Sequence, residues 1–143
     1  GTPGISDPGY RVVNLAKKEG IEVIAIPGPS AVTAALSISG IPTDHFYFEG
    51  FLPPKKGRKK RFELLESFPA TVVIFESPHR VIRTLDDIHN YWGNRIISVC
   101  RELTKMYEES FIGYVTDAEK YFSKSKPKGE FVLLISKEGY ALD

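Results

Sequence analysis

Short apolar runs alternate along the chain with stretches of helical periodicity, and this alternation constrains the fold more than any other feature. Runs such as Thr71–Phe75 and Phe131–Ile135 are each about as long as one strand, and amphipathic stretches lie between the runs. The pattern is typical of an α/β domain rather than of a helical bundle or a β-sandwich. We therefore predict an α/β fold: a three-layer domain with a mixed, mostly parallel sheet of five or six strands and helices on both faces.

The apolar runs and the turn residues predict where each element lies. Strands are expected at residues 22–26, 46–51, 71–75, 96–100, 109–115 and 131–136. Helices are expected at residues 8–18, 30–39, 59–68, 79–92 and 117–124. Asp7, Ser30 and Asp117 are the expected N-caps, and Gly20 and Gly40 the expected stops. Residues 109–115 alternate loosely, which favours an antiparallel strand.

Size and composition describe an ordinary globular chain. It has 143 residues, of which 42% are hydrophobic and 26% charged, so disorder is excluded and no disulfide or metal is needed for stability. The single Cys100 cannot pair within the chain and indicates a reducing compartment, which we take as the cytoplasm, or a buried thiol. No apolar run approaches the roughly 20 residues that cross a bilayer, so no membrane segment is expected.

A net charge of +1 conceals one strongly basic segment. Six cations and no acid lie within residues 55–61, so the rest of the chain carries a net charge of −5. These cations are Lys55, Lys56, Arg58, Lys59, Lys60 and Arg61. A polyanion would be attracted locally to such a segment, although a charged helix start that only keeps the surface soluble is the alternative.

Most familiar catalytic signatures are absent. The chain has no GxxxxGK[ST], GxGxxG, GxSxG or HExxH pattern, so a P-loop, a Rossmann fingerprint, a nucleophile elbow and a zinc protease are unsupported. One cysteine and three scattered histidines predict no metal site. Ser77 and His79 are two residues apart and would not face each other on regular structure, so a catalytic triad is not supported.

Three rigid or polar loops lie at expected strand-to-helix junctions, where open α/β sheets bind ligands. The first, residues 1–9, holds three glycines and two prolines and exposes backbone N–H groups at a helix start. The second, residues 27–31, is a Pro-Gly-Pro turn that leads into a helix of small residues. The third, residues 75–80, ends a buried strand with a carboxylate, a hydroxyl, an imidazole and a guanidinium. Together they predict a polar site along one edge of the sheet, although each loop could also be ordinary.

Several segments in this order resemble a known family. These segments are GTPGISDPGY, IPGPSAVTAALSISGIPTDHFYFEGFLP, the basic segment, FESPHR, CRELTKMYEE and KGEFVLL. They are similar to the tetrapyrrole (corrin/porphyrin) methylase superfamily, and most similar to its ribosomal small subunit methyltransferase I branch. That branch transfers a methyl group from S-adenosylmethionine to a cytidine 2′-hydroxyl of 16S rRNA. The resemblance covers nearly the whole chain.

The resemblance implies two α/β domains with S-adenosylmethionine bound between them. Residues 1–27 would be the end of the N-terminal methylase domain and residues 28–143 the C-terminal one, with the glycine-rich start of the first domain expected before Gly1. The family also implies a homodimer. Carried over by position, the donor contacts fall on Gly1, Thr2, Ile5, Ser30, Ala31, Glu76 and Leu103.

Methyl transfer from S-adenosylmethionine requires little catalysis by side chains. A sulfonium methyl group is already activated, so the enzyme mainly aligns the acceptor oxygen and excludes water. A base or a cation beside a weakly acidic ribose hydroxyl would help. The favoured bases are Glu76 or Glu102, and the favoured phosphate or alkoxide partners are Arg80 or Arg101. The alternatives are that Glu76 caps the following helix and that Arg101 and Glu102 form an ordinary ion pair.

The expected partner is 16S rRNA in the small ribosomal subunit. His79, Lys105 and the six cations of the basic segment are the expected substrate contacts. Two alternatives remain open: a methylase that acts on a tetrapyrrole precursor, and a module that binds RNA without catalysis. Charge alone does not separate them, because a tetrapyrrole with many carboxylates would also meet lysine and arginine.

Overall fold

The chain forms two compact units. The computed structural model describes residues 1–142, so Asp143, the last residue of the predicted second domain, lies outside the described residues. The units are Gly1–Ala31 and Val32–Asp143, and each is described by itself. They divide four residues after the predicted domain boundary at residue 27. The assignment of the units to two methylase domains stays a prediction.

The first unit holds one helix and no strand. Helix α1 (Tyr10–Lys18) has no buried side chain, and Gly20 follows it with a φ of 70°. The predicted buried strand at residues 22–26 is wrong: this segment is irregular, and Ile24 and Ile26 are 69% and 77% exposed. An apolar run forms a strand only where a neighbouring strand completes its hydrogen bonds, and none is paired with it in the described chain.

The second unit is built on a five-stranded sheet with the order β1-β2-β5-β3-β4. The strands are β1 (Phe46–Phe51), β2 (Thr71–Glu76), β3 (Ile96–Arg101), β4 (Glu109–Tyr114) and β5 (Phe131–Ile135). The sheet is mixed, as predicted, and β1, β2 and β3 run in the same direction. Among neighbours, however, only β1 and β2 are parallel, because β5 lies antiparallel between β2 and β3. The expectation of mostly parallel neighbours is therefore corrected.

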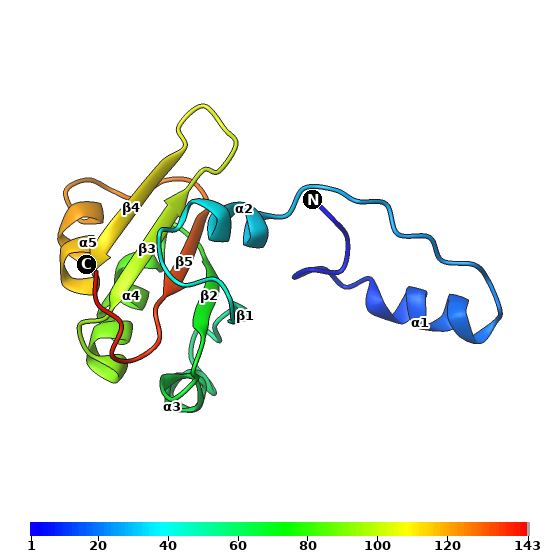
Figure 1. The fold of residues 1–143 in the computed structure, drawn as a ribbon, viewed down its shortest axis with the longest axis horizontal. Coiled ribbons are helices and arrows are strands. Elements are labelled where there is room, and N and C mark those ends of the chain that lie inside the picture. Colours follow the sequence, from blue (N-terminus) through cyan, green and yellow to red (C-terminus); the bar gives the residue numbers. More distant parts are fainter. Residues whose placement is uncertain (143) are drawn as a thin grey trace. The chain divides into compact units, whose positions relative to one another are not determined.

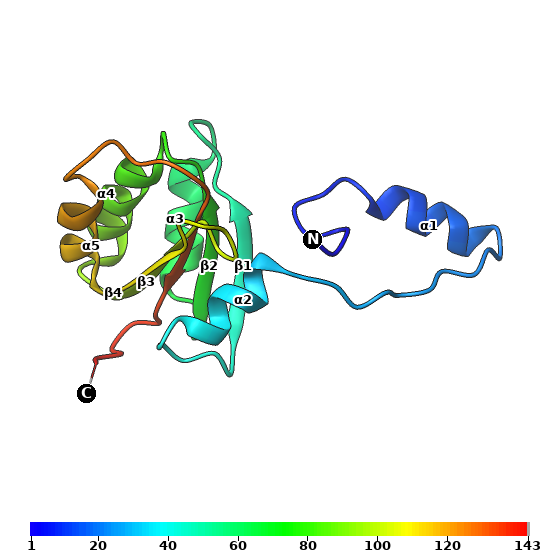
Figure 2. The same cartoon turned by 90° about the horizontal axis from the view of Figure 1, so that it is seen from above.

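Helices cover both faces of this sheet, which confirms the three-layer fold. Helix α2 (Ala31–Ile38) lies on one face, and α3 (Arg58–Glu66), α4 (Val81–Trp92) and α5 (Val115–Phe122) lie on the other (Figures 1 and 2). The larger core lies beneath these three helices. Strand β5 is buried along its whole length, as expected of a strand covered on both faces.

The remaining element predictions differ from the structure only at their ends. Five of the six predicted strands and all five predicted helices are present. Helix α4 begins at Val81 instead of His79, because residues 77–80 form a turn closed by the Arg80 N–H on the Ser77 carbonyl. Helix α5 begins at Val115, two residues before the expected cap Asp117. Strand β4 alternates between half-buried and exposed residues and pairs antiparallel with β3, as predicted.

The strand directions place the third predicted loop, after β2, and Arg101, at the end of β3, at one edge of the sheet. β1, β2 and β3 end there, and β4 and β5 begin there. In register, Phe131 of β5 lies between Glu76 and Arg101, and Arg101 lies opposite Glu109. The basic segment follows β1 at this same edge. We refer to it below as the site edge. The first two predicted loops belong to the first unit and follow no strand there, so the expectation that all three share one sheet edge is corrected.

A buried polar network joins β2, α4 and α3 beside the site edge. Glu76 Oε2 accepts a hydrogen bond of 2.7 Å from the Thr84 hydroxyl, which accepts one of 2.9 Å from Arg58 Nη2. The same guanidinium donates through Nε to Asp87 at 2.8 Å and through Nη1 to the Pro53 carbonyl at 3.2 Å. Glu76, Thr84 and Arg58 are at most 5% exposed. The network therefore pairs charges that would be costly to bury alone.

Replacing Arg58 by Met should lower the free energy of unfolding by about 2–4 kcal/mol, because Asp87 and the Thr84 hydroxyl lose the hydrogen bonds that the buried Arg58 guanidinium donates. Lys59→Met is the matched control, since the Lys59 side chain is 72% exposed, and it should change stability by about 0.5 kcal/mol or less. Urea unfolding of both variants measures the difference. Equal stabilities of the two variants would show that the contacts of Arg58 make no net contribution to the free energy of unfolding.

Candidate functional site

The structure brings the first two predicted loops together within the first unit. The Thr2 N–H donates to the Pro29 carbonyl at 2.7 Å, and the Thr2 hydroxyl donates to the same oxygen at 3.1 Å. A Cβ at Gly1 would lie 3.0 Å from this carbonyl oxygen, and one at Gly28 would lie 3.2 Å from Thr2 Oγ1. Glycine thus permits a close approach of the two backbones. Gly1 and Thr2 are placed beside the turn that leads to Ser30.

The other donor-contact candidates of this unit flank the joined loops. Ala31 is exposed at the first position of α2, and Ile5 is 47% exposed. Asp7 does not cap α1, because the helix begins after Gly9. Instead, the Asp7 carboxylate accepts a hydrogen bond of 3.1 Å from the Gly4 N–H and fixes the loop itself. Ser6 adopts a φ of 52°, so this loop holds backbone strain.

The Glu76 carboxylate points into the helical layer, where it accepts three hydrogen bonds. Its Oε1 accepts hydrogen bonds from the Ser77 N–H at 2.8 Å and from Arg80 Nε at 3.1 Å, and its Oε2 binds Thr84. The Glu76 side chain is 1% exposed and that of Arg80 is 35% exposed. The structure thus brings two catalytic candidates together as an ion pair. His79 lies exposed on the adjacent turn.

The turn after β3 is strained and tightly held. Glu102 and Thr104 have φ values of 51° and 64°, which cost of the order of 1–3 kcal/mol each. Glu102 Oε1 accepts hydrogen bonds from the Glu130 N–H at 2.8 Å and from Lys105 Nζ at 3.2 Å. Lys105 also pairs with the Glu130 carboxylate at 2.7 Å. We call residues 101–105 the strained turn; its Leu103 packs against the core on the α2 face.

These contacts favour the charged forms of Glu102 and Lys105 in the strained turn. The Glu130 N–H, with the Lys105 ammonium, lowers the pKa of Glu102 below its usual value. The Glu130 carboxylate, with Glu102, raises the pKa of Lys105. Gly129 has a φ of 85°, which favours glycine, and a Cβ there would lie 2.6 Å from the Glu102 Cδ and displace that side chain. The roles of Gly129 and Glu130 were missed from the sequence, and KGEFVLL among the resembling segments was the only signal for them.

Arg101 is paired with Glu109 rather than with its neighbour Glu102. Its Nε donates to Glu109 Oε2 at 2.8 Å, and its Nη1 donates to the Lys128 carbonyl at 3.2 Å. The Tyr121 hydroxyl donates to the other oxygen of Glu109. Tyr121, together with Arg101, lowers the pKa of Glu109. Arg101 therefore ties the end of β3 to the segment that precedes β5.

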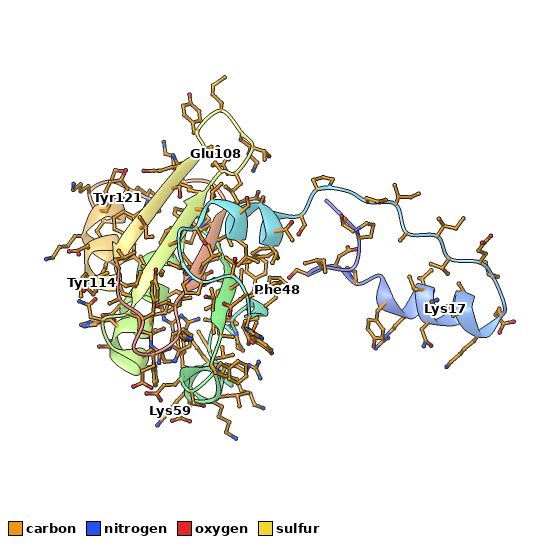
Figure 3. All side chains as sticks on the ribbon, in the orientation of Figure 1. Lys17, Phe48, Lys59, Glu108, Tyr114 and Tyr121 are labelled. Carbon is orange, nitrogen blue, oxygen red and sulfur yellow. The ribbon has the colours of Figure 1, made fainter. Side chains whose placement is uncertain are left out.

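The basic segment separates into two kinds of residue. Arg58 is buried in the polar network, and Arg61 donates to the Glu49 carboxylate through Nε at 2.7 Å and to the Tyr47 hydroxyl through Nη2 at 3.2 Å. The Glu49 carboxylate raises the pKa of Arg61 above its ordinary value. The four lysines are all exposed, and Figure 3 shows Lys59 extending outward from α3. These are Lys55, Lys56, Lys59 and Lys60, called below the lysine cluster.

A small pocket lies beneath the lysine cluster. It has a volume of about 190 Å³ and combines cations of the basic segment with side chains of α4. Its lining residues are Lys55, Arg58, Lys59, Arg83, Asp87 and Tyr91. Arg83 also donates to the Pro54 carbonyl at 3.1 Å, which holds the loop against α4. The pocket presents more positive than negative charge and suits an anion.

The described residues give little support to a thiol nucleophile, a metal site or a membrane-spanning helix. Cys100 is buried, and burial raises the pKa of its thiol, so it is a poor nucleophile. Within residues 1–142, no group of three or more His, Cys, Asp or Glu side chains is placed to hold a metal ion. None of the helices described is both long and apolar enough to span a bilayer.

Comparisons with known proteins agree with this architecture. A sequence model of the Tetrapyrrole (Corrin/Porphyrin) Methylases matches residues 1–119. A Thermotoga maritima protein named ribosomal RNA small subunit methyltransferase I is 46% identical over 95% of the chain, and one of the same name from Halalkalibacterium halodurans is 49% identical over 97%. The chain spans 61% and 48% of the lengths of these relatives.

The fold itself has solved counterparts. The crystal structure of the methyltransferase CobJ superposes with a TM-score of 0.71 at 18% sequence identity and covers 100% of this chain and 64% of its own. At this identity the likeness concerns the fold alone. Together with the match over residues 1–119, it means that the chain belongs to the tetrapyrrole (corrin/porphyrin) methylase family.

Proposed function

We propose that this chain is part of an S-adenosylmethionine-dependent methyltransferase that methylates a cytidine ribose 2′-hydroxyl of 16S rRNA. The observation that carries the proposal is the exposed lysine cluster, which follows β1 at the site edge and adjoins Arg58 of the Glu76 network. The names of relatives 46% and 49% identical support an rRNA substrate. Exposed lysines suit the phosphodiester backbone of RNA, because each lysine is a point charge that can neutralise one phosphate.

The donor would be held by the residues carried over from the family. Gly1, Thr2, Ile5, Ser30 and Ala31 belong to the joined loops of the first unit. The close backbone approach and the small residues there fit a ligand bound largely by main-chain groups. S-adenosylmethionine supplies a methyl group already activated on sulfonium.

The two donor contacts expected in the second unit, Glu76 and Leu103, have buried or half-buried side chains. Because the Glu76 carboxylate is used within the protein, we assign any donor contact at this position to the Glu76 backbone. Leu103 would offer an apolar surface from the strained turn.

Of the two favoured bases, the surroundings support Glu102 over Glu76. Glu76 accepts three hydrogen bonds in the interior, whereas Glu102 lies on the surface turn and its Oε2 has no hydrogen bond within the described chain. The lowered pKa of Glu102 makes it a weak base, so its role would be to orient the hydroxyl and accept its proton late. Lys105, held cationic, would stabilise the oxygen as negative charge develops.

Substituting Ala31 by Leu in the full-length protein should raise the KM for S-adenosylmethionine at least tenfold, because the added side chain would fill the surface beside the joined loops. The melting temperature should change little, since Ala31 is exposed. Thr33→Leu, on an exposed position of the same helix, is the control and should leave the KM unchanged. A steep loss of stability with unchanged KM would instead mean that this helix start is only a packing surface.

Changing the four residues of the lysine cluster to Gln should flatten the dependence of rRNA affinity on salt. Four lost phosphate contacts would reduce the slope of log affinity against log salt by about 3, with donor affinity unchanged. Binding of full-length protein to small subunits across a salt series measures this slope. An unaltered slope would remove the cluster from the substrate site.

The function itself is tested by methyl transfer from labelled donor. The full-length protein is offered naked 16S rRNA, assembled small subunits and a porphyrinogen, and the labelled product is digested to nucleosides. We expect label on an rRNA cytidine at the ribose. Label on a base would correct the acceptor atom, and label only on the porphyrinogen would replace rRNA by a tetrapyrrole substrate.

A further inference from the structure

A second group of lysines lines a groove that the proposed function does not use. The segment between α5 and β5 carries Lys124, Lys126 and Lys128, all exposed. The groove beside it has a volume of about 570 Å³ and is lined also by residues of β3, β4, α5 and β5. Figure 3 shows Tyr121 on α5, and this residue, which lines the groove, is 41% exposed.

The charge of this groove is strongly positive. Glu109 is the one acidic residue among those that line it, and the Arg101 guanidinium neutralises it at 2.8 Å. None of the three lysines forms an ion pair with a carboxylate in the part of the chain that the structure describes. The groove therefore combines three net positive charges with the aromatic ring of Tyr121. An anionic ligand with aromatic rings would match both the charge and the ring.

The groove lies at the far end of the site edge from the lysine cluster. The lysine segment leads into β5, whose first residue, Phe131, is in register with Glu76 and Arg101. The Arg101 guanidinium donates to the Lys128 carbonyl, so the segment is tied to the end of β3. The lysine cluster follows β1, the outermost strand on the other side. Four strand spacings separate β1 from β4, which is about 20 Å.

We propose that this groove is a second contact for single-stranded RNA, with Lys124, Lys126 and Lys128 on its phosphates and the Tyr121 ring against a base. The inference rests on the proposed function, because it takes the same rRNA as the ligand. An RNA strand held at both ends of the site edge passes over the strained turn and the β2 end between them. Two separated contacts fix the direction of the strand, which one cluster of flexible lysines cannot do.

The first test replaces Lys124, Lys126 and Lys128 by Gln in the full-length protein. The matched control changes Lys17, Lys18 and Lys137 to Gln, which removes the same charge from exposed residues that are not among those lining the groove. With a single-stranded 16S rRNA segment as the probe, the groove variant should reduce the slope of log affinity against log salt by about 2, and the control should not. Equal slopes for both variants would overturn the proposal.

The second test separates a base contact from charge alone. Tyr121→Leu should weaken binding of the same RNA by about tenfold without changing the salt slope, because base stacking on an aromatic ring is lost. Tyr121→Phe keeps the ring and should bind within about twofold of the unchanged protein. Thermal melting of both variants checks that the Phe111 and Phe122 packing around the ring survives. Equal binding by folded Leu and Phe variants would exclude the stacking contact.

Failure of this inference is distinguishable from failure of the proposed function. The binding series needs no methyl transfer, so it reports on the groove even if rRNA is not methylated. If the unaltered protein methylates rRNA but the groove variant binds RNA as its control does, only the groove proposal is overturned. A loss of binding seen with assembled subunits but not with naked RNA would assign the groove to a ribosomal protein and would also overturn the RNA contact.

Discussion

The second unit depends on the hydrogen bonds that connect Glu76, Thr84, Arg58 and Asp87. They fasten the end of β2 to α4 and α3, which are otherwise joined by apolar packing that has no preferred register. A buried carboxylate without these donors would be expensive, so the four side chains must be satisfied as a set. The site edge is consequently rigid at β2, and the buried Arg58 fixes the start of α3, with Lys55 and Lys56 just before it and Lys59 and Lys60 just after it.

The different chemistry of arginine and lysine explains why the cations of the basic segment act differently. A guanidinium has five donors in a planar fork, so Arg58 and Arg61 can each satisfy several acceptors in or near the interior. Lysine is a compact, strongly hydrated charge and remains in water. The arginines thus anchor α3 while the lysines stay exposed for a polyanion.

Much of the fold, but less of the site, was predictable from the sequence. Apolar runs and glycine stops located the sheet and its helices, because burial on both faces requires continuous apolar strands such as β5. Residues 22–26 were misassigned, since an apolar run does not reveal whether a neighbour exists to pair with it. The contacts of Arg58 with Asp87 and of Glu130 with Glu102 join residues 29 and 28 positions apart, and the pairing of Arg101 with Glu109 depends on the register of β3 and β4. Composition and spacing specify neither.

Helix α1 buries none of its nine residues, and this has a thermodynamic consequence. A helix shorter than about 12–15 residues is marginal in water on its own, so its apolar side chains must find a surface before the helix is fully formed. Amide protons of α1 should then exchange far faster than those of β5, whose side chains are all buried. In this chain, a ligand that bound the joined loops and ordered α1 would have a measured affinity that includes the conformational entropy of that ordering.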